Sequence, residues 1–244
     1  MRFPPVLIAA PTSSSKNYCW HEWIENAMQF NYLDFKIELY DNTNDSGINA
    51  KYLNSEFKKM FGNSVKFQAF HSNRMGIEST FHKITISLNQ MRDSFLKNGW
   101  KYLFSLETDV FPQKDIIQNL MFNRKSVVGA LYWRDEGIYR KPMIQTMVWC
   151  SPKNIKSFNM VAGDDASFVD GNLKKVGSVG LGAVLISRPV LDKIKFRFIE
   201  GNDSSCDTYF SEDVYQNGWQ IFSDTSQIAR HKNQAWGIYK EDYH

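Results

Sequence analysis

Two carboxylates separated by a single residue are the strongest candidate for chemistry in this sequence. Glu107 and Asp109 follow directly on the apolar run 103–106, which is typical of a buried β-strand. Alternate side chains of an extended segment point to the same side, so both carboxylates can converge on one cation. Carboxylate oxygens in an open site suit Mg²⁺ or Mn²⁺, with phosphate oxygens of a substrate completing the coordination. Acidic residues also commonly end strands as exposed loop residues, and the local pattern leaves that second interpretation open.

A second acidic pair and a late histidine are further candidates. Ser211 followed by Glu212 and Asp213 has the pattern of a helix start, where Ser is a good cap and the helix dipole favours acids. A carboxylate at a helix start can also act as the general base that deprotonates a hydroxyl. His231 offers an imidazole nitrogen as a third metal ligand, although a lone histidine is more often structural.

A cluster of glycines lies before an apolar segment in the second half of the chain. Gly177, Gly180 and Gly182 lead into the apolar run 183–186, which predicts a strand. The dinucleotide-binding fingerprint has another glycine spacing and precedes a helix, so a nicotinamide-dinucleotide site is disfavoured. The cluster indicates either close approach of the backbone to a substrate or simple turns and a bulge.

The elements that position these residues begin with a strand, a helix and a second strand. The apolar run 6–10 ends at Pro11 and predicts a strand followed by a polar loop. Apolar residues at three- and four-residue spacing over 20–28 predict a helix with one buried face. A second strand over 35–40 ends at Asp41. This order, with polar groups at the strand ends, predicts a parallel α/β sheet.

The remaining elements continue the α/β pattern. The clearest helix is predicted over 77–98, where apolar residues alternate steps of four and three and Gly99 supplies the stop. It leads into a strand over 101–106, which carries Glu107 and Asp109. The other predicted elements are a helix over 115–121, a strand over 127–132, a helix over 189–194, a helix from Ser211 to Gly218 and a strand near 220–222. The polar and aromatic segment 134–173 is interpreted as acceptor-side loops.

Composition places the chain among ordinary globular proteins. The chain has 244 residues, of which 43% are hydrophobic and 23% charged, a composition that predicts one α/β domain. The net charge of +3 does not demand a nucleic-acid partner. Three widely spaced cysteines suggest neither a disulfide framework nor a thiolate zinc site, which fits a reducing cytoplasm. No early apolar run reaches the roughly 20 residues needed to span a bilayer, so we predict no integral membrane segment and a cytoplasmic location.

Taken in order, these features resemble GT-A glycosyltransferases, broadly the family 2 type and the related fungal mannosyltransferase group. The resemblance covers most of the chain and rests on the opening strand 6–11, Asp41, Glu107-Thr108-Asp109 as a variant of the Asp-x-Asp motif, Gly180-Leu181-Gly182-Ala183, Glu212-Asp213 and His231. It implies an α/β fold of the GT-A type, with a Rossmann-like, mostly parallel sheet flanked by helices. It also implies a single catalytic domain over 1–244, with the donor half at about 1–110 and the acceptor half at about 111–244.

The resemblance implies a nucleoside-diphosphate sugar as the donor, with UDP or GDP as the expected nucleotide. Pro11, Thr12 and Asp41 would hold the base and ribose of this donor. Arg140 and Lys141 would add positive charge near its phosphates.

The resemblance likewise implies a metal site and a catalytic base. Asp109, with His231 and Glu107, would bind Mn²⁺ or Mg²⁺ at the diphosphate, and Glu107 would face the ribose or a metal-bound water. Asp213 would deprotonate the acceptor hydroxyl in a single inverting displacement, and Glu212 would position the acceptor. Glu107 is a departure, because the family usually has Asp at this position and the longer side chain alters the metal geometry.

Other functions compete with this hypothesis. One is a nucleotide-sugar or glycan-binding protein that keeps the fold without turnover. Another is a nucleic-acid-modifying glycosyltransferase that acts on a flipped, hydroxylated base through aromatic and basic residues such as Trp133, Arg134, Tyr139, Arg140 and Lys141. A nucleotidyltransferase is disfavoured because no glycine-rich phosphate loop lies near 10–16. The sequence leaves the acceptor open among a glycan, a lipid-linked group, a protein and a modified nucleic acid.

Overall fold

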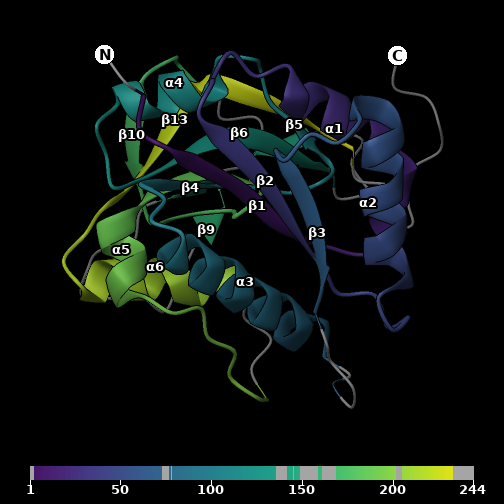
Figure 1. The fold of residues 1–244 in the computed structure, drawn as a ribbon. Helices are drawn as coiled ribbons and strands as arrows, with labels where there is room; N and C mark the ends of the chain where they lie inside the picture. The colour runs from purple at the N-terminus through teal and green to yellow at the C-terminus, as the bar shows by residue number, and fades with distance from the viewer. Residues whose placement is uncertain are drawn as a thin grey trace.

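The first half of the chain alternates strands and helices (Figure 1). The computed structural model describes residues 3–72, 77, 79–135, 142–144, 146–148, 159–160, 169–201 and 205–232. The elements of the first half are β1 (Val6–Thr12), η1 (Ser14–Cys19), α1 (Trp20–Met28), β2 (Phe35–Asp41), α2 (Ile48–Phe61), β3 (Phe67–His71), α3 (Thr80–Lys97), β4 (Tyr102–Leu106) and β5 (Val110–Phe111). The strands and helices predicted at β1, α1, β2, α3 and β4 are confirmed. Helix α2 and strand β3 were not predicted from the sequence.

The second half contributes two long strands, several short ones and three helices to the described part of the chain. These elements are α4 (Ile116–Phe122), β6 (Val127–Asp135), β7 (Pro142–Ile144), β8 (Thr146–Val148), β9 (Asn159–Met160), β10 (Leu173–Val176), β11 (Ser178–Val179), β12 (Ala183–Ser187), α5 (Arg188–Lys193), α6 (Cys206–Gln216) and β13 (Ile221–His231). Helices α4 and α5 lie where the apolar pattern predicted them. The predicted limits of the last helix and the last strand were wrong.

Helix α6 begins at Cys206, so the prediction that Ser211 caps a helix was wrong. Ser205 precedes the first turn, and the buried face of the helix is already established by Cys206, Tyr209, Phe210, Ser211 and Val214. Ser211 is therefore an interior residue, and its Oγ donates to the carbonyl of Asp207 one turn earlier at 2.8 Å. As a consequence, Glu212 and Asp213 lie in the second half of α6 and not in its first turn.

Strand β13 continues to His231, well past the predicted end near 222. It runs parallel to β6, and the pairing shifts between Asp224 and Ile228 before it resumes at Leu131 and Tyr132. The polar residues in this irregular stretch interrupt the apolar pattern, which explains why the sequence indicated only a short strand. The resumed pairing carries β13 far enough to place His231 at the end of a strand.

The large sheet is mixed but mostly parallel. Its strand order is β10-β13-β6-β12-β4-β1-β2-β3, with β5 paired to β13 and β7 paired to β6. Strands β3, β2, β1 and β4 are parallel neighbours, and β12 is antiparallel to both β4 and β6. Strands β11, β8 and β9 form a small second sheet. The fold class predicted from the sequence is confirmed by this arrangement.

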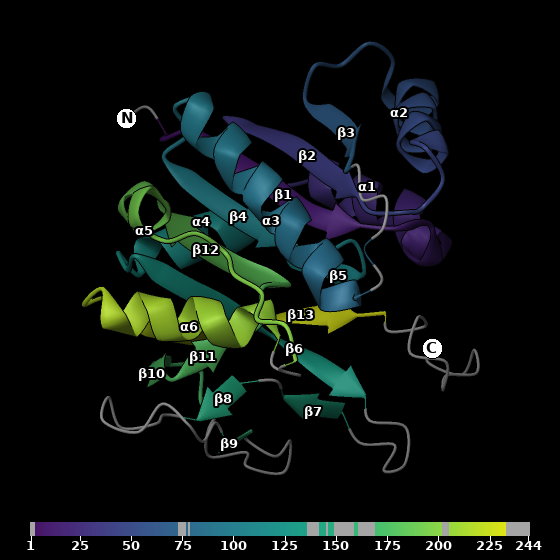
Figure 2. The same cartoon turned by 90° about the horizontal axis from the view of Figure 1, so that it is seen from below.

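Helices cover both faces of the large sheet. In Figure 1, α1 and α4 lie above the sheet, α2 lies to its right beside β3, and α3, α5 and α6 lie below it; Figure 2 shows the latter three from their own side. Alternate residues of β1 divide between the two cores, with Val6, Ile8 and Ala10 in one and Leu7 and Ala9 in the other. Apolar residues on both faces are what a sheet covered on both sides requires. Among the helices described, none is both long enough and apolar enough to cross a membrane.

The order of the strands determines where a site can form. After β1 the chain adds β2 and β3 on one side, and it then returns to add β4 on the other side of β1. The carboxyl ends of β1 and β4 therefore diverge at a topological switch point, where open α/β sheets bind ligands. Thr12 ends β1, and Glu107 directly follows β4.

Candidate functional site

The last residues of three neighbouring parallel strands are polar and lie opposite one another. Thr12 of β1 pairs with Asp41 of β2, and Asp41 pairs with His71 of β3. The backbone continues the row, because the N–H of Asn42 donates to the carbonyl of Thr12 at 2.7 Å. Pro11 lies one residue earlier on β1, opposite Tyr40. The structure therefore brings the predicted donor-binding residues together at one edge of the sheet.

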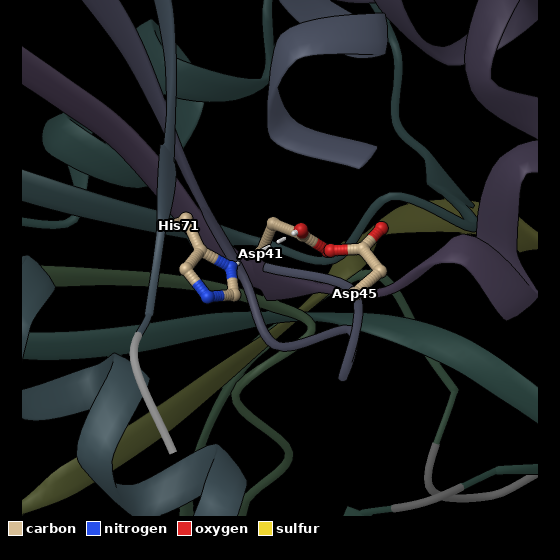
Figure 3. A group of neighbouring side chains, drawn as sticks. All are labelled: Asp41, Asp45 and His71. Carbon is tan, nitrogen blue, oxygen red and sulfur yellow. Dashed lines mark ion pairs between the residues drawn. The ribbon is translucent and has the colours of Figure 1, made fainter. Parts of the chain in front are cut away.

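Asp41 is fully buried, and only one of its two carboxylate oxygens is satisfied. Oδ1 accepts hydrogen bonds from Thr43 Oγ1 at 2.6 Å and Asn49 Nδ2 at 2.9 Å. Oδ2 faces Nδ1 of His71 at 3.9 Å, and neither atom makes a hydrogen bond within the residues that the structure describes (Figure 3). A buried carboxylate oxygen without a partner is costly, so this gap is suited to a ligand N–H or O–H or to a cation.

Asp45 completes a group that could hold a metal ion beside β2 and β3. One ligand atom each of Asp41, Asp45 and His71 lies within 4.8 Å of the others (Figure 3). The two oxygens of Asp45 also accept from the backbone N–H groups of Gly47 at 3.0 Å and Asn49 at 2.7 Å, which fixes the loop before α2. Two carboxylates and one imidazole suit a divalent transition metal.

A second group forms just beyond β4, where the structure brings Asp109 and His231 together. Strand β5 pairs with the end of β13, so that Val110 is opposite His231. The N–H of Lys232 donates to the carbonyl of Asp109 at 2.8 Å, which anchors the same junction. Nε2 of His231 consequently lies 3.6 Å from Oδ2 of Asp109. The predicted metal ligands thus meet, although they are far apart in the sequence.

Lys16, which the sequence analysis did not select, lies between Glu107 and Asp109. Its Nζ is 2.7 Å from Oδ2 of Asp109 and 3.3 Å from Oε2 of Glu107. Burial opposes the positive charge on Lys16, but the two carboxylates outweigh it and raise the pKa of Lys16 above its ordinary value. Burial likewise opposes the negative charge on Asp109, yet His231 and Lys16 lower the pKa of its carboxyl group. Asp109 is therefore an ionised carboxylate in a buried position.

A third carboxylate, Asp207, faces the same region from the first turn of α6. The N–H of Leu181 donates to Oδ2 of Asp207 at 3.2 Å. Burial, and then the negative charge of Glu107, together raise the pKa of Asp207 to about 6. Sequence reasoning missed Asp207 because it placed the helix start at Ser211. The apolar spacing that begins at Cys206 was the signal that could have located the true first turn.

The glycine cluster lets a tyrosine reach the centre of the site. The hydroxyl of Tyr132 on β6 accepts a hydrogen bond from the N–H of Gly182 at 3.2 Å, and the carbonyl of Gly182 accepts from the N–H of Glu107 at 2.9 Å. A Cβ atom at Gly180 would lie 2.0 Å from the Tyr132 hydroxyl, and one at Gly182 would lie 2.8 Å from it. Gly180 and Gly182 thus make room for Tyr132, and the predicted approach of their backbone to a substrate stays a prediction. The rings of Tyr132 and His231 are close to perpendicular, with centroids 5.3 Å apart.

Glu212 and Asp213 are held by Arg197. Nη2 of Arg197 lies 2.7 Å from Oε2 of Glu212, and its Nε lies 2.9 Å from Oδ2 of Asp213. Asp213 is six residues beyond Asp207, which is about 9 Å further along the helix axis. The predicted catalytic role of this pair stays a prediction, and the contacts show that both side chains have a structural partner.

Several residues singled out in the sequence lie outside this description. Tyr139, Arg140 and Lys141 are not among the described residues. Trp133 and Arg134 belong to β6, but the description does not extend to their side chains. The hypothesis that these residues contact donor phosphates or a nucleic acid stays a prediction.

Comparison with known proteins identifies the fold. By sequence, no protein-family model and no curated protein matches the chain. Among solved structures, GalNAc-T7 with UDP, GalNAc and Mn²⁺ is similar at a TM-score of 0.63 and 10% identity, over 94% of this chain and 44% of that one. The mannosyltransferase PcManGT from Pyrobaculum calidifontis, in complex with GDP-Man and Mn²⁺, is similar at a TM-score of 0.61 and 10% identity, over 99% of this chain and 59% of that one.

A third similar structure matches over most of both chains. A197 from STIV is 16% identical with a TM-score of 0.51, over 95% of this chain and 87% of that one. The chain spans about half the length of GalNAc-T7 and PcManGT, at 44% and 59%. These likenesses establish that the chain has the GT-A fold, as predicted. The resemblance to family 2 and to the fungal mannosyltransferase group stays a prediction.

Proposed function

We propose that the chain is a glycosyltransferase that moves a sugar from a nucleoside-diphosphate sugar to an acceptor hydroxyl. The observation that carries the proposal is the convergence of Glu107, Asp109, His231 and Asp207 at the switch point of a GT-A fold. Such a site contains cation ligands and a carboxylate of raised pKa side by side. These are the two components that a displacement at a sugar carbon needs, namely a stabiliser for the leaving diphosphate and a base for the attacking hydroxyl.

The row of Thr12, Asp41 and His71 is the proposed site for the donor's nucleoside. The unsatisfied Oδ2 of Asp41 can accept an N–H of the base or a ribose hydroxyl, which removes the cost of a buried orphan oxygen. Asn49 and Thr43 hold the other oxygen of Asp41 and so fix the direction of Oδ2. UDP or GDP is the proposed nucleotide, because UDP accompanies GalNAc-T7 and GDP-Man accompanies PcManGT in their structures.

Asp109, His231 and Glu107 would hold Mn²⁺ or Mg²⁺ in this proposal. The donor set of two carboxylates and one imidazole suits Mn²⁺, and Oδ1 of Asp109 is buried without a hydrogen bond in the described part of the chain. The cation would supply positive charge that stabilises the leaving nucleoside diphosphate. The chain's contribution is to hold Glu107 and Asp109 on the turn that follows β4, and His231 at the end of β13.

Asp207 is the proposed general base. Its carboxylate takes the proton of the acceptor hydroxyl while the hydroxyl oxygen bonds to the anomeric carbon and the nucleoside diphosphate leaves with the bonding electrons. A single displacement of this kind inverts the anomeric configuration. The raised pKa of about 6 makes Asp207 a stronger base than an ordinary aspartate while leaving it ionised at neutral pH. Asp207 replaces Asp213 in this role because Asp213 is paired with Arg197 further along α6.

The proposed donor-binding and acceptor-side residues follow one another in the sequence. Residues up to about 110 supply the nucleoside row and the first cation ligands, and the rest of the chain supplies Asp207, Tyr132 and His231. We propose that the acceptor enters from the side of α6 and β12, where Leu181 and Gly182 border Asp207 and Tyr132.

The test is a binding and turnover screen of UDP, GDP, CDP and their sugars, with and without Mn²⁺. Isothermal titration should show that Mn²⁺ tightens the binding of one nucleotide. The sugar donor built on that nucleotide should then be hydrolysed slowly in water, which releases its sugar. Binding of the same nucleotide without any release or transfer of sugar would instead support a nucleotide-sugar-binding protein. A well-folded sample that binds none of them would contradict the proposal.

A further inference from the structure

Lys16 lies at the centre of the carboxylate site, and the mechanism above gives it no role. Its side chain is about one-fifth exposed, at 21%, and its ammonium contacts both Glu107 and Asp109. The backbone around it is fixed, because the N–H of Lys16 donates to Ser13 at 3.0 Å and its carbonyl accepts from Sγ of Cys19 at 3.3 Å. The short helix η1 therefore directs Lys16 into the site.

The ammonium contacts the same oxygen that a divalent cation would use. Nζ of Lys16 lies 2.7 Å from Oδ2 of Asp109, the oxygen that also faces Nε2 of His231 at 3.6 Å. A cation bound by Asp109 and His231 would lie roughly 2.1 Å from each ligand atom, which is the spacing of Mn²⁺ and Mg²⁺ in protein sites. An ammonium at hydrogen-bond distance from one of those ligand atoms would then repel the cation at close range.

We propose that the ammonium of Lys16 occupies the cation position of this site when no metal is bound. A divalent cation must then compete with this ammonium for Glu107 and Asp109. In the metal-free protein the ammonium of Lys16 pairs with Glu107 and Asp109, and when a divalent cation is bound the ammonium leaves both carboxylates. The inference rests on the proposed function only in assigning Asp109, Glu107 and His231 as cation ligands. It makes a statement about metal affinity that holds whether or not the protein transfers sugar.

The competing explanation is that Lys16 is a purely structural ion pair. A structural pair would stabilise the fold, and its loss would leave metal binding unchanged or weaken it through local disorder. Competition predicts that loss of Lys16 strengthens metal binding, because removing the ammonium frees two carboxylates and removes a repulsive charge.

The experiment measures Mn²⁺ binding to the full chain by electron paramagnetic resonance of free Mn²⁺, without nucleotide. Lys16→Met should bind Mn²⁺ at least about tenfold more tightly than the unmodified protein, since one positive charge near the cation is lost. Lys16→Arg keeps the charge and should bind Mn²⁺ like the unmodified protein. Lys174→Met is the matched control, because it removes a lysine from an ion pair with Asp170 outside the site.

Two further measurements keep the proposal testable if Lys16→Met is unstable. Mn²⁺ should raise the melting temperature of Lys16→Met more than that of the unmodified protein, because at one Mn²⁺ concentration the stabilisation by a ligand grows with the logarithm of its affinity. Adding Asp109→Asn to Lys16→Met should abolish the gain in Mn²⁺ affinity, which would show that the gain arises at this site. Equal or weaker Mn²⁺ binding by Lys16→Met, or no binding by any of the variants, would overturn the proposal.

Discussion

Oδ2 of Asp207 accepts a hydrogen bond from the backbone N–H of Leu181 at 3.2 Å. The next residue, Gly182, is bonded through its carbonyl to Glu107 and through its N–H to Tyr132. One dipeptide therefore fixes the positions of the proposed base, the proposed cation ligand and the tyrosine between them. All three donors are backbone N–H groups, so the main chain at Leu181, Gly182 and Glu107 sets where the side chains of Asp207 and Tyr132 are held.

Replacing Asp207 should therefore abolish transfer without abolishing donor binding. Asp207→Asn keeps the shape and the hydrogen bond from Leu181 but cannot accept a proton, so kcat should fall by about a hundredfold to ten-thousandfold. Asp213→Asn is the matched control and should retain most activity, because Asp213 is paired with Arg197. The measurement is sugar release and transfer, with donor affinity from titration. A larger loss in Asp213→Asn than in Asp207→Asn would restore the assignment made from the sequence.

The pH dependence of the reaction should reflect the same carboxyl group. Burial, and then the charge of Glu107, raise the pKa of Asp207 to about 6, and only the ionised form can accept the acceptor's proton. The kcat/KM value should thus rise with pH and level off above pH 6. A rate profile that is flat between pH 5 and 7 would exclude Asp207 as the titrating base.

Stability should change with pH in the opposite sense. A carboxyl group whose pKa is higher in the folded protein than in the unfolded chain, where Asp titrates near about 4, favours folding most when it is protonated. Asp207 should therefore reduce stability as pH rises from about 4 to about 6. Asp207→Asn should melt at a higher temperature than the unmodified protein at pH 7 and at the same temperature at pH 4, in buffer with a chelator. Equal melting temperatures of the two proteins at pH 7 would contradict the raised pKa of Asp207.

Substitutions at Asp109 and His231 should weaken cation binding. Asp109→Asn or His231→Ala removes one ligand of the proposed site, and either should weaken Mn²⁺ binding by roughly tenfold or more. Nucleotide binding without metal should change little. Calorimetric titration of Mn²⁺ into each variant checks this, and an unchanged affinity in both variants would place the cation elsewhere.

The group at Asp41 and His71 should bind the nucleoside and not the catalytic cation. Asp41→Asn replaces the unsatisfied carboxylate oxygen by an amide, and we expect nucleotide affinity to fall by about tenfold, since a hydrogen bond to a charged group is worth about 1.5 kcal/mol or more. Mn²⁺ affinity measured without nucleotide should stay the same. If His71→Ala lost a bound metal ion and kept nucleotide affinity, then Asp41, Asp45 and His71 would form a metal site.

The packing of Tyr132 against two glycines gives a prediction about stability. The Cβ atom of Gly180→Ala would lie 2.0 Å from the Tyr132 hydroxyl, so the variant should lose about 1–3 kcal/mol of unfolding free energy through overpacking. Tyr132→Phe removes the clashing oxygen, and the double variant should recover much of that loss. Urea unfolding of the single and double variants measures the coupling. Additive losses would show that the clash is relieved by backbone movement.

The sequence predicted most of the first half of the fold because its apolar patterns are strong. The steps of four and three in α3 and the stop at Gly99, whose φ is +73°, are purely local signals. The opening strand, helix and strand were equally clear. Helix α2 was missed because its buried apolar residues Ala50, Leu53 and Phe57 are widely spaced among many polar ones.

The candidate site was predicted only in part, since it depends on contacts between distant segments. Glu107, Asp109 and His231 carried recognisable residue types, but nothing local indicates that β5 pairs with the end of β13. Lys16 and Asp207 carried no motif, and their importance lies in what the fold places beside them. The helix start at Cys206 overrode the local signal at Ser211, because burial of an apolar face outweighs a capping preference.

The pairing of β5 with β13 also determines when the site comes into existence. The ribosome synthesises Asp109 long before His231, and the amino-terminal strands can begin to fold while the last strand is still unmade. Until β13 pairs with β5 and β6, Asp109 lacks its imidazole neighbour. On the proposed function, the cation site is therefore complete only once β13 has joined the sheet, and we expect no sugar transfer before that point.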